Sequence, residues 1–287
     1  MWRRAFKGEL SRALRGRWFK IALAIGCLLA VASFAFDSQT YWTDYGYMVT
    51  AREKYDLTNT TLAVKSWMGT DLQPTSLIFY LLVPLLALAP YSWSLCSELK
   101  SGYAAQMVTR MGARGYYLAK AAVTFVISGL STSLPLLLSC CLAFVAAPND
   151  VPNAHNWITL SWPINPYDVG SWLFFNRPVA YMALWVAWGF ICAGLWGLCV
   201  LAVSSLFRNR VALIAGAYGV QLGLYALGLS IPSAFGSSDW MGIDLITAML
   251  PVYYDLHASI PSMLIYLVAS ASISALIPIL GRKRDLL

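Results

Sequence analysis

Six long apolar runs alternate along the chain with segments that are polar or charged. Each run is close to the about 20 apolar residues that a helix needs to cross a hydrocarbon core about 30 Å thick. The runs cover about 18–36, 76–97, 121–147, 178–206, 211–235 and 260–280. This pattern predicts an all-α membrane protein in which residues 1–287 form a single transmembrane domain with six transmembrane helices.

The overall composition supports this interpretation. The chain is 59% apolar and 11% charged, whereas a soluble domain is typically about 45–50% apolar and about 25% charged. These values exclude a soluble domain, and the low charge also excludes a disordered chain. The basic segment before the first run is too long for a signal peptide, and Phe34-Ala35-Phe36 is a poor cleavage site. We therefore expect the first run to remain as a span.

The formal net charge of +7 is distributed unevenly. Most basic residues fall within 1–20, 98–120, 208–210 and 282–284, whereas most acidic residues fall in the intervening loops, such as 37–75. The positive-inside rule then predicts a plasma-membrane protein with both termini cytoplasmic. We interpret the positive charge as an orientation signal and a surface for contact with the lipid bilayer, so we expect no nucleic-acid partner.

The N-terminal segment, residues 1–20, has the pattern of a basic amphipathic helix lying at the membrane interface. Large apolar side chains recur every fourth residue, and basic side chains lie between them. The predicted membrane-interface residues are Trp2, Arg3, Arg4, Phe6, Leu10 and Trp18. A simple cluster of charges that orients the first span is the alternative.

The cytoplasmic segment 98–117 contains a second short amphipathic helix. Leu99, Tyr103 and Met107 share one helical face, and Gly112 and Gly115 end the helix before the third run. An exposed helix of this kind suits docking into a groove of a partner protein. A plain connecting loop is the alternative.

This segment resembles the membrane subunits of ATP-binding-cassette type-2 transporters. The residues that carry the resemblance are Glu98, Gly102, Arg110, Arg114 and Lys120, with Met111-Gly112 standing where that family commonly has Pro. The resemblance implies that Glu98–Arg114 is a coupling helix that contacts a separate ATPase subunit. The coupling residues that it suggests are Glu98, Lys100, Gly102, Tyr103, Met107, Arg110 and Arg114. It also implies a homodimer or a pair of homologous permeases, with ATP and magnesium held by the ATPase.

Candidate chemistry is sparse elsewhere in the chain. There is no HExxH zinc motif and no G-x-x-x-x-G-K-[ST] phosphate loop, so we expect no catalytic residue, no metal site and no cofactor in this chain. The six cysteines lie in or beside the apolar runs, which argues against an external disulfide framework. The runs lack interior charges, which disfavours a proton-coupled transporter.

Mildly polar residues and small residues occur within the runs. Ser128, Thr132 and Gln221 are candidates for a substrate path, although such side chains mostly bond between helices. Two lines of small residues allow close helix contact, within the chain or between subunits. These lines are Gly189, Ala193 and Gly197 in the fourth run, and Ala215, Gly219 and Gly223 in the fifth.

The external segments are rich in aromatic residues. We expect the first external loop, 37–75, to form one or two helices that cap the spans. The segment 240–257 is apolar until Pro251 and predicts a short re-entrant or surface helix before the last span. These features, with the uncharged spans, favour an amphipathic substrate such as a peptide, a drug or a lipid.

The function that follows is that of a membrane-spanning permease subunit. It would export its substrate with energy from a separate ATPase, and it would not itself be an enzyme. A sensor or immunity module of the same superfamily, which binds a membrane-active peptide without net transport, is the first alternative. A secondary transporter and a membrane scaffold are the others.

Overall fold

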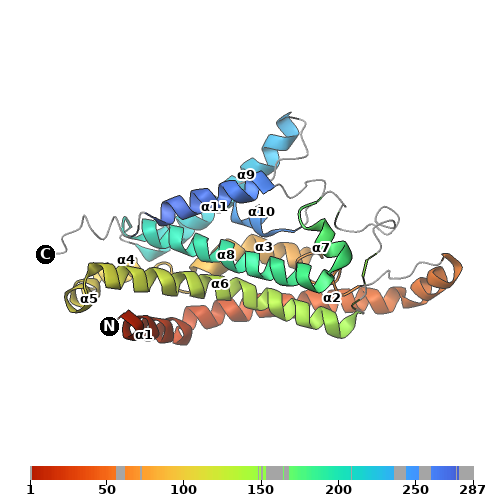
Figure 1. Cartoon of the computed structure of the whole chain (residues 1–287), viewed down its shortest axis with the longest axis horizontal. Coiled ribbons are helices and arrows are strands. Elements are labelled where there is room, and N and C mark those ends of the chain that lie inside the picture. The colour runs from red at the N-terminus through yellow and green to blue at the C-terminus, as the bar shows by residue number, and fades with distance from the viewer. Residues whose placement is uncertain are drawn as a thin grey trace.

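The computed structural model of the chain describes residues 2–55, 62–71, 73–147, 149, 151–152, 164, 168–207, 209–235, 244–251, 260–275 and 277. Every regular element within these ranges is a helix. The helices are α1 (Trp2–Arg15), α2 (Arg17–Tyr55), α3 (Pro74–Leu88), α4 (Ser94–Lys100), α5 (Tyr103–Met111), α6 (Ala113–Ala146), α7 (Ser171–Asn176), α8 (Pro178–Ser204), α9 (Arg210–Phe235), α10 (Leu245–Met249) and α11 (Ile260–Ser274). Helices α1, α4 and α5 lie at one end of the molecule, and α7 lies toward the other (Figure 1).

Four of these helices are long and apolar enough to cross a membrane, as expected of a multi-pass membrane protein. They are α6, α8, the Arg17–Gln39 part of α2 and the Arg210–Ser230 part of α9. The predicted runs 76–97 and 260–280 contain the shorter apolar helices α3 and α11. The prediction of an all-α membrane fold is therefore confirmed among the described residues, with four helices of spanning length where the sequence predicted six.

Run 76–97 is interrupted because of its prolines. Helix α3 ends at Leu88, and a turn through Pro90 separates it from α4. Proline lacks the N–H that a helix interior needs, and its ring clashes with the preceding turn. Pro84 lies inside α3, where nearby carbonyls accept bonds from other helices. Trp196 Nε1 donates to the Pro84 carbonyl at 3.1 Å, and Ser131 Oγ donates to the Leu86 carbonyl at 3.0 Å.

The segment after the first span, where one or two capping helices were expected, begins as a continuation of the span's own helix. Helix α2 continues without interruption to Tyr55, well beyond the predicted end of the span near residue 36. The 62–71 segment then turns back into the protein and buries Leu62, Trp67 and Met68 completely. The backbone N–H of Met68 donates to Ser139 Oγ of α6 at 2.9 Å. This part of the predicted external loop is therefore packed against the helix bundle.

Helices α6 and α8 pack most closely, because glycines on each helix receive aromatic rings from the other. A Cβ on Gly129 would lie 2.6 Å from the ring of Phe190, and a Cβ on Gly194 would lie 2.6 Å from the ring of Phe125. The two rings meet edge to face, with centroids 5.5 Å apart. One turn further along α8, Gly197 lies directly against Ser128. The α8 line of small residues thus serves packing within the chain.

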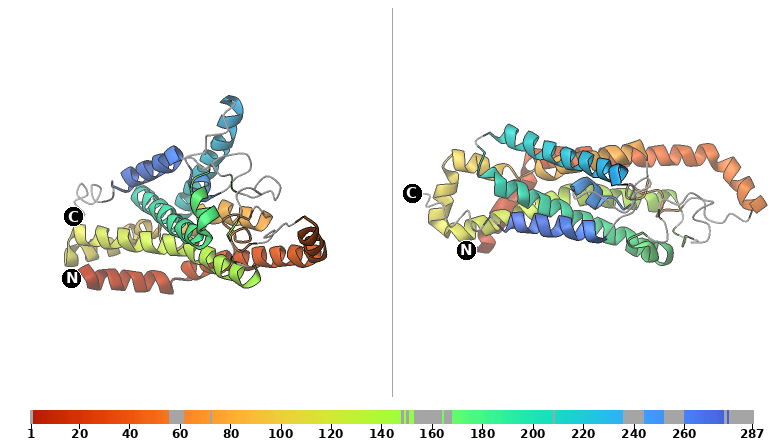
Figure 2. Two further views of the ribbon diagram at one scale, coloured as in Figure 1. Left: turned by 45° about the vertical axis from the view of Figure 1, so that its right-hand side comes forward. Right: turned by 90° about the horizontal axis from the view of Figure 1, so that it is seen from above.

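The α9 line of small residues has the opposite environment. Nothing lies within 4 Å of a Cβ built on Gly216, Gly219 or Gly223, and Ala215 is exposed. The C-terminal part of α9 stands away from the other helices in Figure 1 and in the left view of Figure 2. Helix α9 therefore offers an open face of small residues over 215–223.

The short helix α10 is buried among α3, α8, α9 and α11. Asp244 caps its first turn, with Oδ2 accepting from the Thr247 N–H at 3.0 Å. Gln221 Oε1 accepts from the Leu245 N–H at 2.9 Å, and Trp188 Nε1 donates to the Ala248 carbonyl at 2.7 Å. Since Gln221 and Trp188 lie well inside α9 and α8, α10 is inserted between the long helices, which favours a re-entrant segment over a surface helix.

The two lines of small residues give a direct test of the packing. Gly197→Ala places a methyl group against Ser128 on a neighbouring helix and should lower the free energy of unfolding by about 1–3 kcal/mol, as overpacking does. Gly219→Ala adds the same group to open space and should leave stability unchanged or slightly raised. Thermal unfolding of the two variants in detergent measures the difference. Equal unfolding temperatures would contradict the α6–α8 contact.

Candidate functional site

Helix α5 is a short element held between two glycines at one end of the bundle. Gly102 (φ 73°) and Gly112 (φ 78°) both occupy the left-handed region, which glycine adopts without steric cost. The side chains of Ala104, Met107 and Val108 pack on an apolar cluster that includes Tyr116 of α6 and Leu201 of α8. The opposite face of α5 is exposed at Gln106, Thr109 and Arg110. The predicted amphipathic helix is therefore present in part. Its end at Gly112 is confirmed, but Gly102 separates Leu99, which lies in α4, from Tyr103 and Met107 in α5, and Gly115 lies inside α6.

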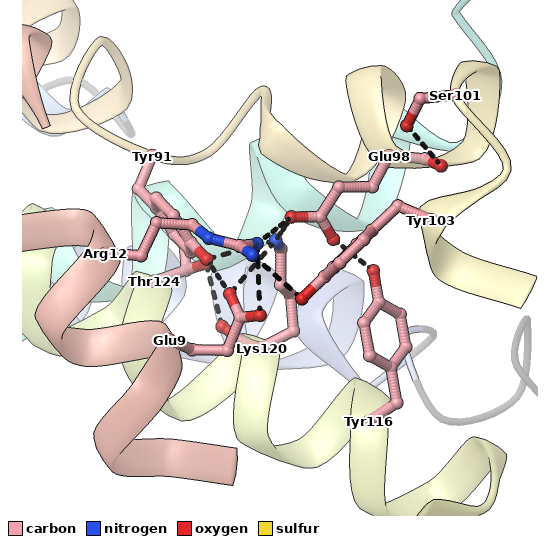
Figure 3. Close-up of polar contacts among 9 residues, drawn as sticks. All are labelled: Glu9, Arg12, Tyr91, Glu98, Ser101, Tyr103, Tyr116, Lys120 and Thr124. Carbon is pink, nitrogen blue, oxygen red and sulfur yellow. Dashed lines mark hydrogen bonds and ion pairs between the residues drawn. The ribbon is translucent and has the colours of Figure 1, made fainter. Parts of the chain in front are cut away.

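Beside α5 lies a group of charged and hydroxyl side chains centred on the buried Lys120, which we call the Lys120 cluster (Figure 3). It comprises Glu9, Arg12, Tyr91, Glu98, Tyr103, Tyr116 and Lys120. These residues come from the helices α1, α4, α5 and α6 and from the turn between α3 and α4. The cluster thus joins five parts of the chain at a single point.

Lys120 is the centre of this cluster and is only 1% exposed. Its Nζ lies 2.5 Å from Glu98 Oε1 and 3.6 Å from Glu9 Oε2. It also donates to the Tyr91 hydroxyl at 3.1 Å and lies 4.5 Å from the centre of the Tyr91 ring. An ammonium group removed from water needs this number of partners, because an isolated buried charge is very costly.

The two carboxylates of the cluster are also fully engaged. Tyr116 donates its hydroxyl to Glu98, and Tyr91 donates its hydroxyl to Glu9. Arg12 Nη1 lies 3.4 Å from Glu98 Oε1 and 3.4 Å from Glu9 Oε1. The two carboxylates are thus balanced by Lys120, which is buried with them, and by Arg12, whose side chain is 50% exposed at the edge of the cluster. This pairing makes the burial of the carboxylates tolerable.

Arg12 connects the cluster to α5. Its Nη2 donates to the Tyr103 hydroxyl at 2.8 Å, and its guanidinium lies 4.6 Å from the centre of the Tyr103 ring. Burial lowers the pKa of Arg12, but the Tyr103 hydrogen bond and the two carboxylates raise it above its usual value on balance. Arg12 therefore stays charged and holds α1 against the start of α5.

The coupling residues suggested by the resemblance divide into three groups. Glu98 and Tyr103 belong to the Lys120 cluster, where their polar atoms bond within the chain. Gly102 and Met107 shape and pack α5. Lys100, Arg110 and Arg114 are exposed at the same end of the molecule. The exposed group provides the charges that can meet another protein.

The predicted interface residues all lie on or beside α1. Phe6 and Leu10 pack on an apolar cluster that includes Tyr91 and Val123, whereas Trp18, at the start of α2, is 50% exposed. Trp2, Arg3 and Arg4 lie within α1, and their side chains fall outside the described part of the structure. The apolar stripe of α1 thus faces the bundle in part, rather than lipid alone.

The three candidate substrate-path residues are buried and bonded within the chain. Gln221 accepts from the backbone of α10, Ser128 lies against Gly197, and Thr132 Oγ1 donates to the Gly129 carbonyl at 3.1 Å. Their positions are those of residues that hold helices together. A role in a substrate path stays a prediction.

A smaller polar group lies around the start of α3. Asp71 Oδ2 accepts from Ser33 Oγ at 2.9 Å and from Ser76 Oγ at 3.0 Å, and its Oδ1 accepts from the Gln73 N–H at 2.9 Å. Burial raises the pKa of Asp71, although these hydrogen bonds oppose the shift. Among the described residues, no group of His, Cys, Asp or Glu side chains could hold a metal ion. We interpret the Asp71 group as structural.

Sequence reasoning missed four members of the Lys120 cluster, namely Glu9, Arg12, Tyr91 and Tyr116. One signal was available, since Glu9 is the single acidic residue of α1 and lies three residues before Arg12. A lone carboxylate in a basic helix often has a specific partner. The two tyrosines carried no comparable signal, because aromatic residues are frequent throughout this chain.

Comparisons with known proteins do not add a relative to this picture. No family model, no curated protein and no solved structure matches the chain. The resemblance of residues 98–120 to type-2 transporter subunits therefore has no independent support. The function has to be argued from the arrangement of the helices and the Lys120 cluster.

Removal of Lys120 tests the cluster. Lys120→Met leaves Glu98 and Glu9 buried without their central cation and should lower the free energy of unfolding by about 3–5 kcal/mol. Adding Glu98→Gln to this variant removes one unpaired charge and should restore part of the loss. Lys7→Met, at an exposed position on α1, is the matched control. Thermal unfolding in detergent measures all three, and a Lys120→Met variant as stable as the control would contradict the arrangement.

Proposed function

We propose that the chain is the membrane subunit of an ATP-binding-cassette exporter, with α5 as the helix that docks on a separate ATPase subunit. The observation that carries this proposal is the arrangement of α5 itself. It is a short amphipathic helix at the end of a membrane bundle, with one face packed and one polar face open. Such a helix suits a groove on a partner protein.

The Lys120 cluster supports a mechanical role for α5. A freely hinged loop would not transmit force to the rest of the protein. Helix α5, in contrast, is joined to α1 by the hydrogen bond from Arg12 to Tyr103. The preceding helix α4 is joined to α6 by the pair of Glu98 with Lys120. ATP-driven closure of two ATPase domains would push α5, and the cluster would carry the displacement into α1 and α6. In this mechanism Glu98 acts inside the membrane subunit, while the exposed Arg110 and Arg114 meet the ATPase.

The proposed topology keeps six crossings with both termini cytoplasmic, in the plasma membrane. Helix α3 supports this, because its first residues lie near Ser33 of α2 and the turn after it reaches Glu9 of α1. It therefore runs back along most of the first span despite its 15 residues. Helix α11 lies along α8, where Tyr266 donates its hydroxyl to the Cys192 carbonyl at 3.0 Å. The positive-inside rule supports the orientation.

The open face of α9 supports assembly of two membrane subunits. Small residues on a membrane helix allow another helix to approach closely, and the Gly216, Gly219 and Gly223 face has no neighbour within the described chain. We propose that α9 lies at the junction with a second copy or a homologous permease. The substrate would pass between the two subunits, with ATP and magnesium bound by the ATPase partner.

The proposed substrate class is an amphipathic peptide, drug or lipid. The described spans have few charged groups to bind a small ion, and their exposed faces are apolar. ATP-dependent uptake of a fluorescent amphipathic dye into inverted membrane vesicles distinguishes export from sensing, because a sensor would bind without net uptake.

Co-purification tests the docking role of α5. When the tagged full chain is isolated from native membranes, a protein with a G-x-x-x-x-G-K-[ST] motif should accompany it in stoichiometric amount. Arg110→Glu reverses one exposed charge on α5 and should reduce the accompanying ATPase roughly tenfold. Lys7→Glu makes the same reversal on α1 and is the matched control. Mass spectrometry identifies and quantifies the partner.

Two results would overturn the docking role. One is the absence of any such ATPase from the purified material. The other is that Arg110→Glu and Gly102→Pro each retain as much ATPase as the unmodified chain, provided that both variants remain folded. An equal loss with Lys7→Glu would assign the effect to total charge and would count against α5 as the contact.

A separate substitution tests the subunit junction. Gly219→Leu places a bulky side chain on the open face of α9 and should raise the dissociation constant of the paired subunits at least about tenfold. Ala271→Leu adds a similar bulk to the exposed face of α11 and should leave pairing intact. Energy transfer between labelled copies in reconstituted bilayers measures pairing. Equal transfer in both variants would exclude α9 from the junction.

A further inference from the structure

A polar cavity lies beside the Lys120 cluster, between α4 and the start of α9. It has a volume of about 470 Å³ and is lined by Cys96, Ser97, Lys100, Asn209 and Arg210. The Cys96 thiol donates to the Phe207 carbonyl at 3.0 Å. This bond holds the turn between α8 and α9 against α4, so two parts of the chain far apart in sequence form the cavity together.

The groups that line the cavity are suited to an anion. Lys100 and Arg210 are both basic, and the described residues that line the cavity include no acidic side chain. Arg210 lies 5.4 Å from the centre of the Trp93 ring, which positions its guanidinium. Asn209 Oδ1 accepts from the Val211 N–H at 3.0 Å, so its amide nitrogen can still donate. Two cations, an amide and the Ser97 hydroxyl are a fitting set for the oxygens of a phosphate group.

The surroundings of the cavity distinguish a lipid phosphate from a free one. The chain that enters α9 carries large apolar side chains that are turned outward. Leu206 is 69% exposed and Val211 is 65% exposed. A phospholipid has an anionic headgroup, which suits the basic cavity, and apolar acyl chains, which suit the exposed apolar residues beside it. A lipid phosphate would use both the cavity and these apolar residues, whereas a free phosphate or a nucleotide would use the cavity alone.

We propose that this cavity binds an anionic phospholipid. Lys100, Arg210, Asn209 and Ser97 hold the phosphate, and the acyl chains lie along Leu206 and Val211. Basic pockets between membrane helices are suited to such headgroups. This proposal does not depend on the proposed transport function, because it uses only the cavity and its apolar border.

Titration with defined lipids tests the proposal. The full chain, freed of lipid in detergent, is titrated with phosphatidylglycerol and the bound lipids are counted by native mass spectrometry. We expect one saturable site, with phosphatidylcholine binding much more weakly. Lys100→Gln combined with Arg210→Gln should raise the dissociation constant about 30-fold. Arg110→Gln combined with Arg114→Gln removes the same charge from the neighbouring exposed surface and should leave the site intact.

Each alternative outcome has a clear meaning. If glycerol 3-phosphate or inorganic phosphate displaces the lipid at equal concentration, the cavity binds free phosphate and the lipid assignment is wrong. If both double variants weaken phosphatidylglycerol binding equally, the lipid is attracted by the total positive charge rather than by a specific site, and the proposed site is wrong. Unfolding temperatures measured without lipid check the fold. If the double variant is unstable, Lys100→Gln alone should still weaken binding about fivefold, and unchanged binding would overturn the proposal.

Discussion

Burial of a lysine inside a bundle of apolar helices is the constraint on which this structure depends. Lys120 can leave water only if carboxylates and hydroxyls meet it, and the chain supplies them from segments up to 111 positions away. The partners of Lys120 thus bring the helices α1, α4, α5 and α6 and the turn between α3 and α4 to one point. Because the requirement is local and strict, it fixes the relative position of helices whose apolar surfaces alone would permit several arrangements.

The rest of the bundle is held by close packing together with a few hydrogen bonds between helices. Glycines on α6 and α8 receive aromatic rings, and the buried α10 is hydrogen-bonded by Gln221 and Trp188 from two longer helices. The contacts between glycines and rings depend on shape and tolerate little change. The molecule therefore combines a polar anchor at one end with a tightly packed middle, and among the four helices of spanning length α9 is the least buried.

The sequence predicted the helical class and an amphipathic helix that ends at Gly112, because each depends on local pattern. It did not predict that this segment is divided at Gly102. It could not predict that Glu9 and Arg12 pair with Glu98 and Lys120, since that pairing follows from how distant helices meet. Two lines of small residues with the same spacing proved to have opposite environments, one packed and one open. Nothing in their spacing distinguishes them, because only the neighbours decide. Helix within 37–75 was expected, but its continuity with the first span up to Tyr55 was not, because the polar residues that follow the span suggest the end of one helix and the start of another.

The burial of the Lys120 pairs with Glu98 and Glu9 has a consequence for how the protein responds to ionic strength. Salt screens the interactions of charges that are exposed to water, but it screens buried pairs much less. Raising the salt concentration would thus weaken interactions of the exposed Arg110 and Arg114 and of the half-exposed Arg12, while the pairs that Lys120 of α6 makes with Glu98 and Glu9 stay in place. A wash with concentrated salt would therefore leave α1, α4 and α6 joined at this end of the molecule.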